Sequence, residues 1–205
     1  MNDESYMTQW NVSRETLERL QIFDATIRKW NPRINLVSRN SLDALWDRHI
    51  NDSIQVLRTV KPGARWVDLG SGGGFPGLIA AIVLHDEAPE TEVILVESDQ
   101  RKSAFLRNAA RECGVTCKVI SDRIEKIEPL QADTLSARAL ASLDLLLEFT
   151  DLHLKKDGTA VFPKGATWKK ELEDAQKKWS FAVETITSLT EPEAAILKIN
   201  GVARV

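Results

Sequence analysis

The chain has 205 residues, of which 43% are hydrophobic and 28% carry a charge. This composition is typical of a globular protein with a sizeable core, and it excludes a wholly disordered chain. The longest apolar run, Leu78 to Leu84, is far shorter than the roughly 20 residues that a membrane-spanning helix needs. The first residues include Asp3 and Glu4 and contain no apolar signal-peptide segment. We therefore expect a cytoplasmic protein that does not associate with membranes.

The two cysteines, Cys113 and Cys117, are too few for a disulfide scaffold. Their C-x3-C spacing, without a nearby histidine, does not favour a zinc site. We expect both thiols to be reduced and structural, the protein to bind no metal, and the chain to be a monomer.

The net charge is −3, from 27 Lys and Arg against 30 Asp and Glu, which by itself argues weakly against a nucleic-acid partner. The charges are unevenly distributed, however. Residues 28–65 carry eight basic and three acidic side chains, and residues 155–178 carry seven lysines and four acids. Such segregation makes basic patches possible on an acidic chain, and a local patch matters more than net charge for capturing a polyanion. The alternative is an evenly mixed, solvated surface.

The first sixty residues carry two helical patterns. In the first, Ser13 is a suitable N-cap, and Asn31-Pro32 predicts the end of the helix. A second helix is predicted to begin at Ser41 and to end before Lys61-Pro62-Gly63. The apolar residues of the first pattern are Leu17, Leu20, Phe23, Ile27 and Trp30, and the inward positions of the second are Leu42, Leu45, Trp46, His49, Ser53 and Leu57. We interpret residues 1–60 as a helical N-terminal extension.

Beyond Gly63, short β-rich runs alternate with helical patterns, which predicts βαβ units and a mainly parallel sheet with helices on both faces. The last two runs are joined by only four residues, too few for a crossover helix, so they should pair antiparallel. We therefore predict an α/β domain over residues 61–205, with a seven-stranded sheet whose last strand is antiparallel. The β-rich runs are Arg65 to Leu69, Glu92 to Glu97, Thr116 to Ile120, Thr134 to Ala137, Thr159 to Phe162, Phe181 to Leu189 and Ala194 to Ile199, and the helical patterns fall at 78–84, 99–112, 143–151 and 167–178.

A glycine-rich loop follows the first predicted strand, with five glycines among residues 70–77. So many glycines are costly in chain entropy, so we expect backbone with positive φ or in contact with a ligand. Gly72-x-Gly74-x-x-Gly77 formally fits a dinucleotide fingerprint. However, Asp68 would repel phosphate, and Pro76 stands where a pyrophosphate-binding helix needs free N–H groups. The arrangement of Asp68, Gly70 and Gly72 is similar to motif I of class I methyltransferases, whose cofactor S-adenosylmethionine carries an ammonium and a sulfonium but no phosphate.

Glu97 closes the second predicted strand. A carboxylate at this strand end can accept hydrogen bonds from both hydroxyls of a ribose. The alternative is an acid favoured by the dipole of the following helix.

Several further motifs, taken together in order and spacing, resemble one family, the RsmG (GidB) family of bacterial 16S rRNA guanine-N7 methyltransferases. The resemblance runs from about Trp30 to the C-terminus. Its motifs are Trp30-Asn31 with Asn35-Leu36, Arg48-His49-Ile50-x-Asp52-Ser53, the loop ending Phe75-Pro76-Gly77, Glu97-Ser98-x-x-Arg101-Lys102-x-x-Phe105-Leu106, Arg123-Ile124-Glu125, Arg138-Ala139-x-Ala141-Ser142-Leu143 and Lys164-Gly165. Gly73, Asp122 and Ala137 depart from the family pattern.

The resemblance implies a class I, Rossmann-like methyltransferase fold and S-adenosylmethionine as cofactor. It assigns cofactor contacts to Gly70, Phe75, Ile124, Glu125 and Arg138, to which the strand-end and loop arguments add Asp68, Gly72 and Glu97. It also implies N7 methylation of guanine 527, in standard rRNA numbering, of 16S rRNA or an assembling small ribosomal subunit.

Guanine N7 has a free lone pair, so its methylation needs no general base, and we nominate no catalytic residue. The enzyme must instead align the reacting atoms. His49 and Asp52 match the family pattern and are candidates for the substrate edge, although an inward histidine is commonly a core residue.

We assign RNA capture to basic residues through salt-sensitive phosphate contacts. The target base must leave its stack to reach the methyl group, and Trp46 or Phe75 could stack on it. The candidate RNA-binding residues are Arg28, Arg33, Arg39, Arg48, Lys164 and Lys169, with Lys29 and Lys170 beside them.

Three alternatives stay open from the sequence. The first is a methyltransferase that acts on another RNA or on a small metabolite. The second is a non-catalytic regulator that binds an adenosine ligand or RNA. The third is an NAD-dependent oxidoreductase.

Overall fold

The computed structural model describes residues 3–205, which form one seven-stranded sheet in the order β3-β2-β1-β4-β5-β7-β6. The strands from β3 to β5 are parallel, and β7 runs antiparallel to both β5 and β6. The predicted fold class is confirmed, including the antiparallel final pair. The strands are β1 (Arg65–Leu69), β2 (Glu92–Val96), β3 (Lys118–Ile120), β4 (Ala132–Ala137), β5 (Leu154–Lys164), β6 (Trp179–Thr187) and β7 (Ala195–Arg204).

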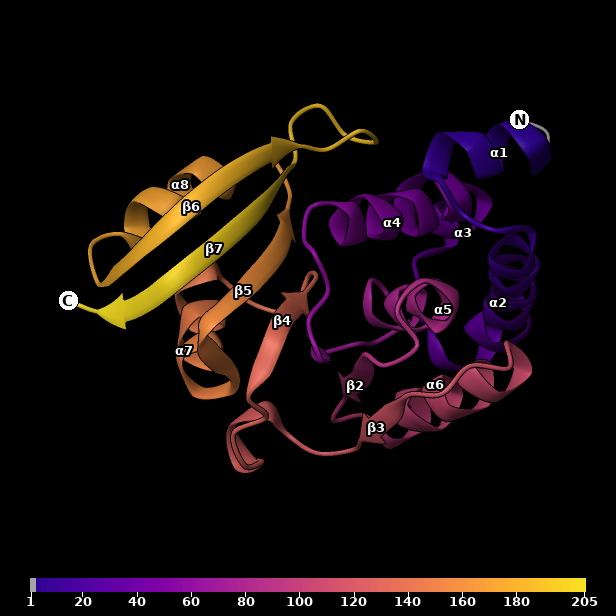
Figure 1. Cartoon of the computed structure of the whole chain (residues 1–205), viewed down its shortest axis with the longest axis horizontal. Coiled ribbons are helices and arrows are strands. Elements are labelled where there is room, and N and C mark those ends of the chain that lie inside the picture. The colour runs from indigo at the N-terminus through magenta and orange to yellow at the C-terminus, as the bar shows by residue number, and fades with distance from the viewer. Residues whose placement is uncertain (1–2) are drawn as a thin grey trace.

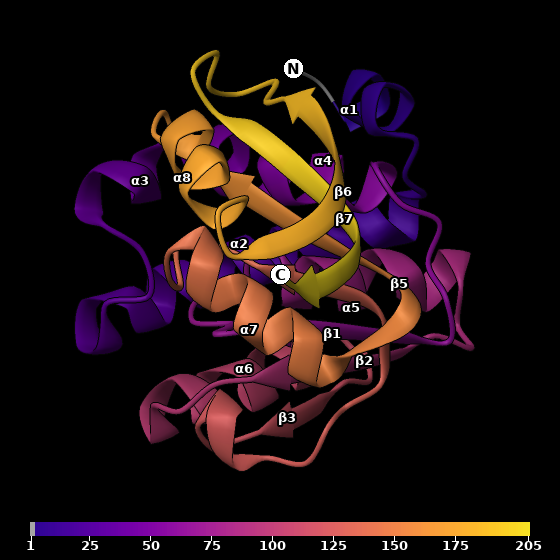
Figure 2. The same ribbon diagram turned by 90° about the vertical axis from the view of Figure 1, so that its left-hand side faces the viewer.

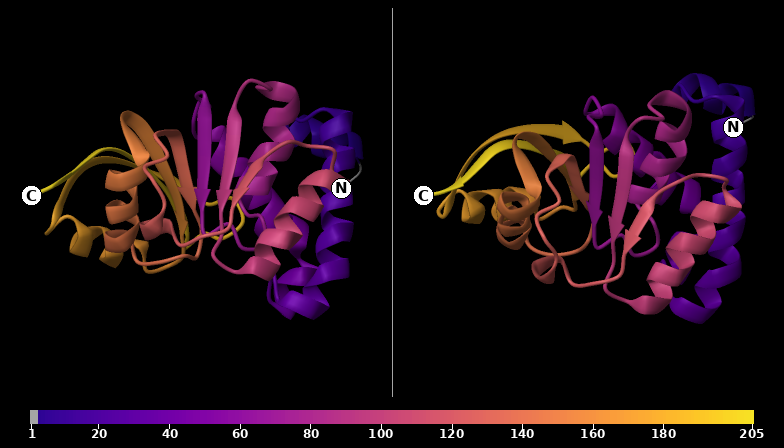
Figure 3. Two further views of the ribbon diagram at one scale, coloured as in Figure 1. Left: turned by 90° about the horizontal axis from the view of Figure 1, so that it is seen from below. Right: turned by 60° about the horizontal axis from the view of Figure 1, so that its bottom comes forward.

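Helices cover both faces of the sheet, as predicted (Figures 1 and 3). One layer is formed by the N-terminal helices with α5 and α6, and the other by α7 and α8. The helical elements are α1 (Asp3–Trp10), α2 (Arg14–Ile34), α3 (Arg39–Asp43), the π-helical turn η1 (Trp46–Ile50), α4 (Asn51–Arg58), α5 (Gly77–Glu87), α6 (Gln100–Glu112), the 3-10 turn η2 (Ile124–Lys126), α7 (Leu143–His153) and α8 (Trp168–Ala175).

Alternation along the central strands explains the two layers of core. In β1, the fully buried Trp66 packs toward the N-terminal helices, and its neighbour Val67 packs on the opposite face. The helix α5 is apolar on all sides because it lies between the sheet and the helices α2 and α4. Tyr6 and Trp10 of α1 belong to the same core cluster as α5, so the helices before residue 60 share a core with the sheet domain.

The first predicted helix begins as expected, because the Ser13 side chain accepts a hydrogen bond from the Thr16 N–H. Its predicted end at Asn31-Pro32 is wrong, since α2 continues to Ile34. The Asn31 side-chain oxygen accepts hydrogen bonds from the backbone N–H groups of Leu36 and Val37. These two hydrogen bonds fix the backbone that follows α2. Pro32 does not end the helix, because near the helix terminus its missing N–H removes only one backbone hydrogen bond.

The second predicted helix is divided into three pieces, which corrects the single helix expected from Ser41. Ser38 caps α3 by accepting a hydrogen bond from the Ser41 N–H. The chain then forms the π-helical turn η1, which holds Arg48 and His49, and continues directly into α4. Hydrophobic spacing alone does not reveal a π-helical turn, because one extra residue shifts the phase without changing the composition.

Figure 2 shows the β6–β7 pair at the front of the molecule, and Figure 1 shows the connection between the two strands extending toward α4. The connection is fixed there by hydrogen bonds, since the Gln55 side chain donates to the Thr187 carbonyl and accepts from the Leu189 N–H. The last strand pair, far from α4 in sequence, therefore forms one wall of the region beside η1. Within residues 3–205, no helix is long and apolar enough to cross a membrane.

Candidate functional site

A cavity of about 640 Å³ lies where the parallel strands β1, β2 and β4 end. This edge of an open parallel sheet is where such folds bind ligands. Seven of the eight predicted cofactor residues line the cavity, all except Asp68. The lining residues predicted from the sequence are Gly70, Gly72, Phe75, Glu97, Ile124, Glu125 and Arg138.

The glycine loop is shaped by its backbone. Gly70 has φ of +65°, and a Cβ built there would lie 2.5 Å from the Leu140 side chain. Gly77, the first residue of α5, comes so close to Asp68 that a Cβ would overlap the carboxylate. Glycine is required at the first position by conformation and at the second by the close approach. The peptide bond between Phe75 and Pro76 is cis.

Glu97 connects the end of β2 to this loop. Its two carboxylate oxygens accept hydrogen bonds from the N–H groups of Gly72 and Asp99, each at 2.8 Å. The side chain is 7% exposed and lines the cavity. Each carboxylate oxygen can accept a second hydrogen bond. Glu97 therefore both orders the loop and retains acceptor capacity for a ligand hydroxyl.

Asp68 lies beneath the loop and does not line the cavity, which corrects its assignment as a direct cofactor contact. It is fully buried, and its Oδ1 accepts a 2.7 Å hydrogen bond from Ser136 Oγ, which in turn accepts one from Trp66 Nε1. Burial raises the pKa of Asp68 to about 6. Its place is structural, because it ties β1 to β4 under the glycine loop.

Only Phe75 and Ile124 among the apolar side chains of the cavity were predicted from the sequence, and the others were missed. Leu140 and Leu145 line the cavity and are 36% and 39% exposed, so their apolar surface is available to a ligand. Lys102 and Arg123 add basic groups beside Glu125. The further apolar lining residues are Leu36, Leu140, Leu145 and Phe149.

Phe75, which lines the cavity, is stacked on His49, with ring centroids 5.0 Å apart. The Arg138 guanidinium lies 5.0 Å from the Phe75 ring centroid, and Phe23 packs against the same ring. Phe75 is only 4% exposed. Burial, with the charges of Arg138 and Arg48, lowers the pKa of His49 to about 3. His49 is therefore a neutral imidazole at physiological pH.

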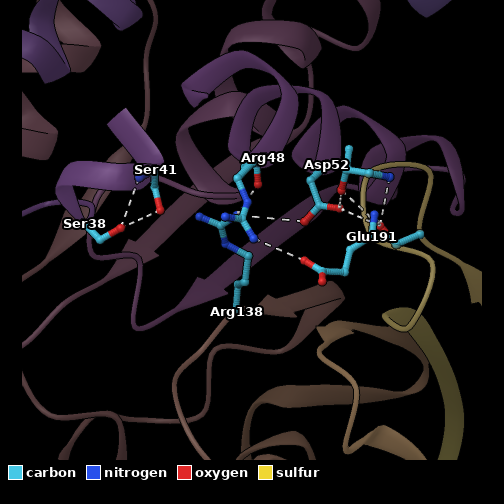
Figure 4. Close-up of polar contacts among 8 residues, drawn as sticks. Ser38, Ser41, Arg48, Asp52, Arg138 and Glu191 are labelled. Atoms are coloured by element: carbon cyan, nitrogen blue, oxygen red, sulfur yellow. Dashed lines mark hydrogen bonds and ion pairs between the residues drawn. The ribbon is translucent and has the colours of Figure 1, made fainter. Parts of the chain in front are cut away.

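A second cavity of about 420 Å³ adjoins the first, and Arg138 and Ala139 line both. Arg48, Asp52, Arg138 and Glu191 converge there from η1, α4, the end of β4 and the β6–β7 connection (Figure 4). Arg138 Nη1 lies 3.9 Å from Asp52 Oδ2, and Arg48 pairs with Glu191 at 3.3 Å. The structure thus brings His49 and Asp52 to the boundary with the predicted cofactor cavity.

Five of the six candidate RNA-binding residues lie at the surface. Arg28, Arg33 and Arg39 are exposed on α2 and α3, although Arg28 also pairs with Asp24. Arg48 is half exposed beside the second cavity, and Lys169 is exposed on α8.

Lys164 does not fit the prediction as a free phosphate contact, because its side chain is only 9% exposed. Its ammonium lies 2.7 Å from Glu171 and donates to the Ala141 carbonyl. Trp46 also departs from its suggested role as a base-stacking residue. It packs edge-on against Tyr6 and lines neither of the two cavities described above.

The residues of the first cavity fit S-adenosylmethionine. The volume lies in the range of small-molecule sites, and the lining combines apolar side chains with many polar and charged groups, which suits a ligand that carries both an adenine ring and a charged amino-acid part. The buried Glu97 can accept from ribose hydroxyls, and the backbone of the glycine loop, without side chains at Gly70 and Gly72, permits close approach. The glycine loop, residues 70–77, contains no basic side chain. This absence suits a ligand that has no phosphate group.

Comparisons with known proteins agree with this site. The family model described as rRNA small subunit methyltransferase G, GidB, matches residues 16–197. A protein of Ruegeria pomeroyi named ribosomal RNA small subunit methyltransferase G is 67% identical over 195 residues, which cover 95% of this chain and 96% of the relative. A protein of the same name from Ruegeria sp. strain TM1040 is 58% identical over the full length of both.

Solved structures share the fold at low identity. A TehB-like SAM-dependent methyltransferase from Corynebacterium glutamicum is 17% identical, with a TM-score of 0.59 over 80% of this chain and 93% of the other. A SAM-dependent methyltransferase from Aquifex aeolicus is 14% identical, with a TM-score of 0.59 over 86% and 96%. The fold is that of such methyltransferases, and by the extent of its match to the family model and the curated relatives the chain belongs to the GidB family, rRNA small subunit methyltransferase G.

Proposed function

We propose that the protein methylates N7 of one guanine, position 527 in standard rRNA numbering, in the 16S rRNA of the small ribosomal subunit, with S-adenosylmethionine as methyl donor. The observation that carries the proposal is the 67% identity, over nearly the whole of both chains, to a ribosomal RNA small subunit methyltransferase G. The cavity at the ends of β1, β2 and β4 supports it, because its residues suit this donor.

When bound, the donor supplies an electrophilic methyl group, and its transfer to N7 moves positive charge from sulfur to the purine with no proton to remove. The protein therefore has to hold and orient the reactants and to accommodate the developing charge on the base. A general base is unnecessary. His49 has a lowered pKa and stays neutral, so it adds no positive charge near the base that becomes cationic.

We assign the donor to the first cavity and the base to the second. Glu97 would accept from the ribose, while Ile124 and the exposed leucines would cover the adenine. Arg138, at the boundary between the cavities, would be held in place by Phe75 and Asp52. Its charge is balanced by the Asp52 carboxylate, which limits repulsion of the methylated, positively charged base.

RNA capture falls to the exposed cations Arg28, Arg33, Arg39, Arg48 and Lys169. Their contacts with phosphate would be independent of sequence and weakened by salt. We propose that the protein acts in the cytoplasm as a monomer, on naked 16S rRNA or on an assembling subunit.

The test is methylation of 16S rRNA and of small subunits from cells that lack this gene. The purified protein is incubated with each substrate and S-adenosylmethionine, and N7-methylguanine is mapped by reduction and strand cleavage at the modified base. We expect one new cleavage site at guanine 527 that requires the protein. Methylation of a different atom or a different position would contradict the proposal, as would donor binding without any transfer.

A further inference from the structure

We propose that the second cavity binds the target guanine with its Watson–Crick edge against Asp52, and that Asp52 Oδ2 accepts hydrogen bonds from the N1–H and N2 amino groups. The inference rests on the proposed function and specifies how the substrate base is recognised. Asp52 is thereby assigned as the specificity-determining residue, and its role goes beyond holding Arg138 in place.

The position of the second cavity sets the orientation of the base. The two cavities meet at Arg138 and Ala139. In guanine, the N7 lone pair and the N1–H point roughly at right angles to each other, and the N2 amino group lies across the ring from N7. A base in the second cavity that presents N7 to the first cavity therefore turns its N1–H and N2 amino groups toward the walls of the second cavity, away from the methyl donor.

Asp52 is the carboxylate in this cavity with an oxygen available. Its Oδ1 accepts from the hydroxyls of Ser188, at 3.3 Å, and Thr190, at 3.1 Å. Its Oδ2 accepts no hydrogen bond from residues 3–205, and its ion-pair partner Arg138 lies at 3.9 Å, beyond hydrogen-bond distance. The two hydroxyls thus fix the carboxylate and leave Oδ2 without a hydrogen bond, facing the Arg138 guanidinium beside the second cavity (Figure 4).

The two other carboxylates of the cavity are less suitable. Glu171 already accepts from the Leu143 N–H and from Lys164. Glu191 is half exposed and paired with Arg48. An exposed ion pair of this kind gives little fixed direction to a hydrogen bond.

A carboxylate in this position selects guanine. Guanine presents two donors on this edge, the N1–H and the N2 amino group, and a carboxylate only accepts. Adenine presents the N1 lone pair, which a carboxylate repels, and has no N2 amino group. Positive charge that develops on the purine makes N1–H and N2–H stronger donors, so the hydrogen bonds to Asp52 strengthen in the transition state. Asp52 is therefore expected to affect kcat as well as binding.

The experiment compares 16S rRNA assembled by splinted ligation with either guanosine or inosine at the target position. Inosine keeps N7 and N1–H and lacks only the N2 amino group. Single-turnover rates are measured at saturating donor. We expect the wild-type protein to methylate the inosine RNA about tenfold more slowly, and the guanosine to inosine ratio to fall to within about twofold of one in Asp52→Ala. On guanosine RNA, Asp52→Asn should lower kcat by tenfold or more.

Two variants serve as controls for the proposed role of Asp52. Asp52→Asn keeps an oxygen for the hydroxyls of Ser188 and Thr190, so it replaces Asp52→Ala if that variant does not fold, with a reduced ratio still expected. Glu191→Gln neutralises the half-exposed carboxylate of the cavity and should keep the wild-type ratio of guanosine to inosine rates.

Equal rates of the wild-type protein on both RNAs, or an unchanged ratio in a folded Asp52 variant, would overturn the base-recognition proposal while leaving the proposed function intact. Absence of N7 methylation on guanosine RNA by the wild-type protein would overturn both.

Discussion

Glu97 and Gly72, which are 25 residues apart, are joined by a 2.8 Å hydrogen bond from the glycine N–H to the carboxylate. The second oxygen of Glu97 accepts from the N–H of Asp99. The same buried side chain thus holds the glycine loop after β1 and the turn before α6. Any change at Glu97 therefore alters the cavity and the connection around it together.

Glu97→Gln should weaken both stability and donor binding. An amide has one acceptor atom, so its NH2 group would face an N–H donor, either at Gly72 or at Asp99. Leaving a buried donor unsatisfied costs about 1–3 kcal/mol, and we expect a loss of that size in the free energy of unfolding by urea. Calorimetric titration with S-adenosylmethionine should show at least tenfold weaker binding.

Glu92→Gln is the control for this change, because Glu92 lies at the other end of β2 in an exposed ion pair with Arg65. Its effect on unfolding should be below about 1 kcal/mol. Donor affinity should stay at the wild-type value. Equal behaviour of the two variants would refute the assignment of Glu97.

Gly70→Ala should block the first cavity. The new Cβ would occupy space held by the Leu140 side chain and would force a positive φ on a non-glycine residue, at a cost of about 1–2 kcal/mol. Gly201 has the same φ of +65° and no atom within 4 Å of a built Cβ. Gly201→Ala should therefore show similar strain in urea unfolding with unchanged donor affinity, whereas Gly70→Ala should lose donor affinity as well. A Gly70→Ala protein that binds donor normally would be incompatible with this geometry.

Asp68 should make stability depend on pH. Its pKa is about 6 in the folded protein against an ordinary value of 3.8, so the folded state binds the proton more tightly. The stability from this group is fully present only well below pH 3.8, is lost as pH rises through 6, and no longer changes above that. Relative to Asp68→Asn, the wild-type protein should lose about 2 kcal/mol of unfolding free energy between pH 4 and pH 7.

Urea unfolding of both proteins at several pH values checks the effect of Asp68. The difference between the two curves removes contributions that both proteins share, including those of Asp86 and Asp133, whose lowered pKa values act in the opposite direction. Parallel curves for the two proteins would show that Asp68 does not titrate in this range.

Lys164→Met should reduce stability and leave the salt dependence of RNA binding unchanged. Lys164 is nearly buried against Glu171, so its removal leaves that carboxylate with the Leu143 N–H and the Thr167 hydroxyl but without its cation. We expect a cost of about 1–3 kcal/mol in the free energy of unfolding. Arg33 is exposed, and Arg33→Ala should reduce the slope of log K against log salt by about 0.7 if it contacts one phosphate of unpaired RNA. Filter binding at several salt concentrations measures both slopes. A reduced slope of log K against log salt in Lys164→Met would show that Lys164 does contact phosphate.

The sheet could be predicted because its signals are local. Arg65–Leu69 was predicted with its observed bounds, since a short β-rich run there is bounded by Pro62-Gly63 and Gly70. The glycine loop and Glu97 were found for the same reason, because a strand end and its next residues are adjacent in sequence. Seven of the eight residues predicted to bind the cofactor line one cavity, although their contact with the cofactor stays a prediction.

What could not be predicted depends on contacts between distant segments. The sequence alone predicts that Lys164 is a free cation. The fold places Glu171 and the Ala141 carbonyl beside its ammonium group. The second cavity arises because Ser188 and Thr190 meet Asp52 across more than 130 residues. The π-helical turn η1, which holds Arg48 and His49, is a further case, since it leaves no mark in hydrophobic spacing.

Arg138 lines both cavities, so its guanidinium can contact a ligand in either of them. If filling one cavity shifts this group, the affinity of the other cavity changes too, and thermodynamic reciprocity requires the two ligands to influence each other by the same factor. Donor and RNA would then bind cooperatively or antagonistically, with the sign set by how Arg138 divides its contacts between Phe75 and Asp52.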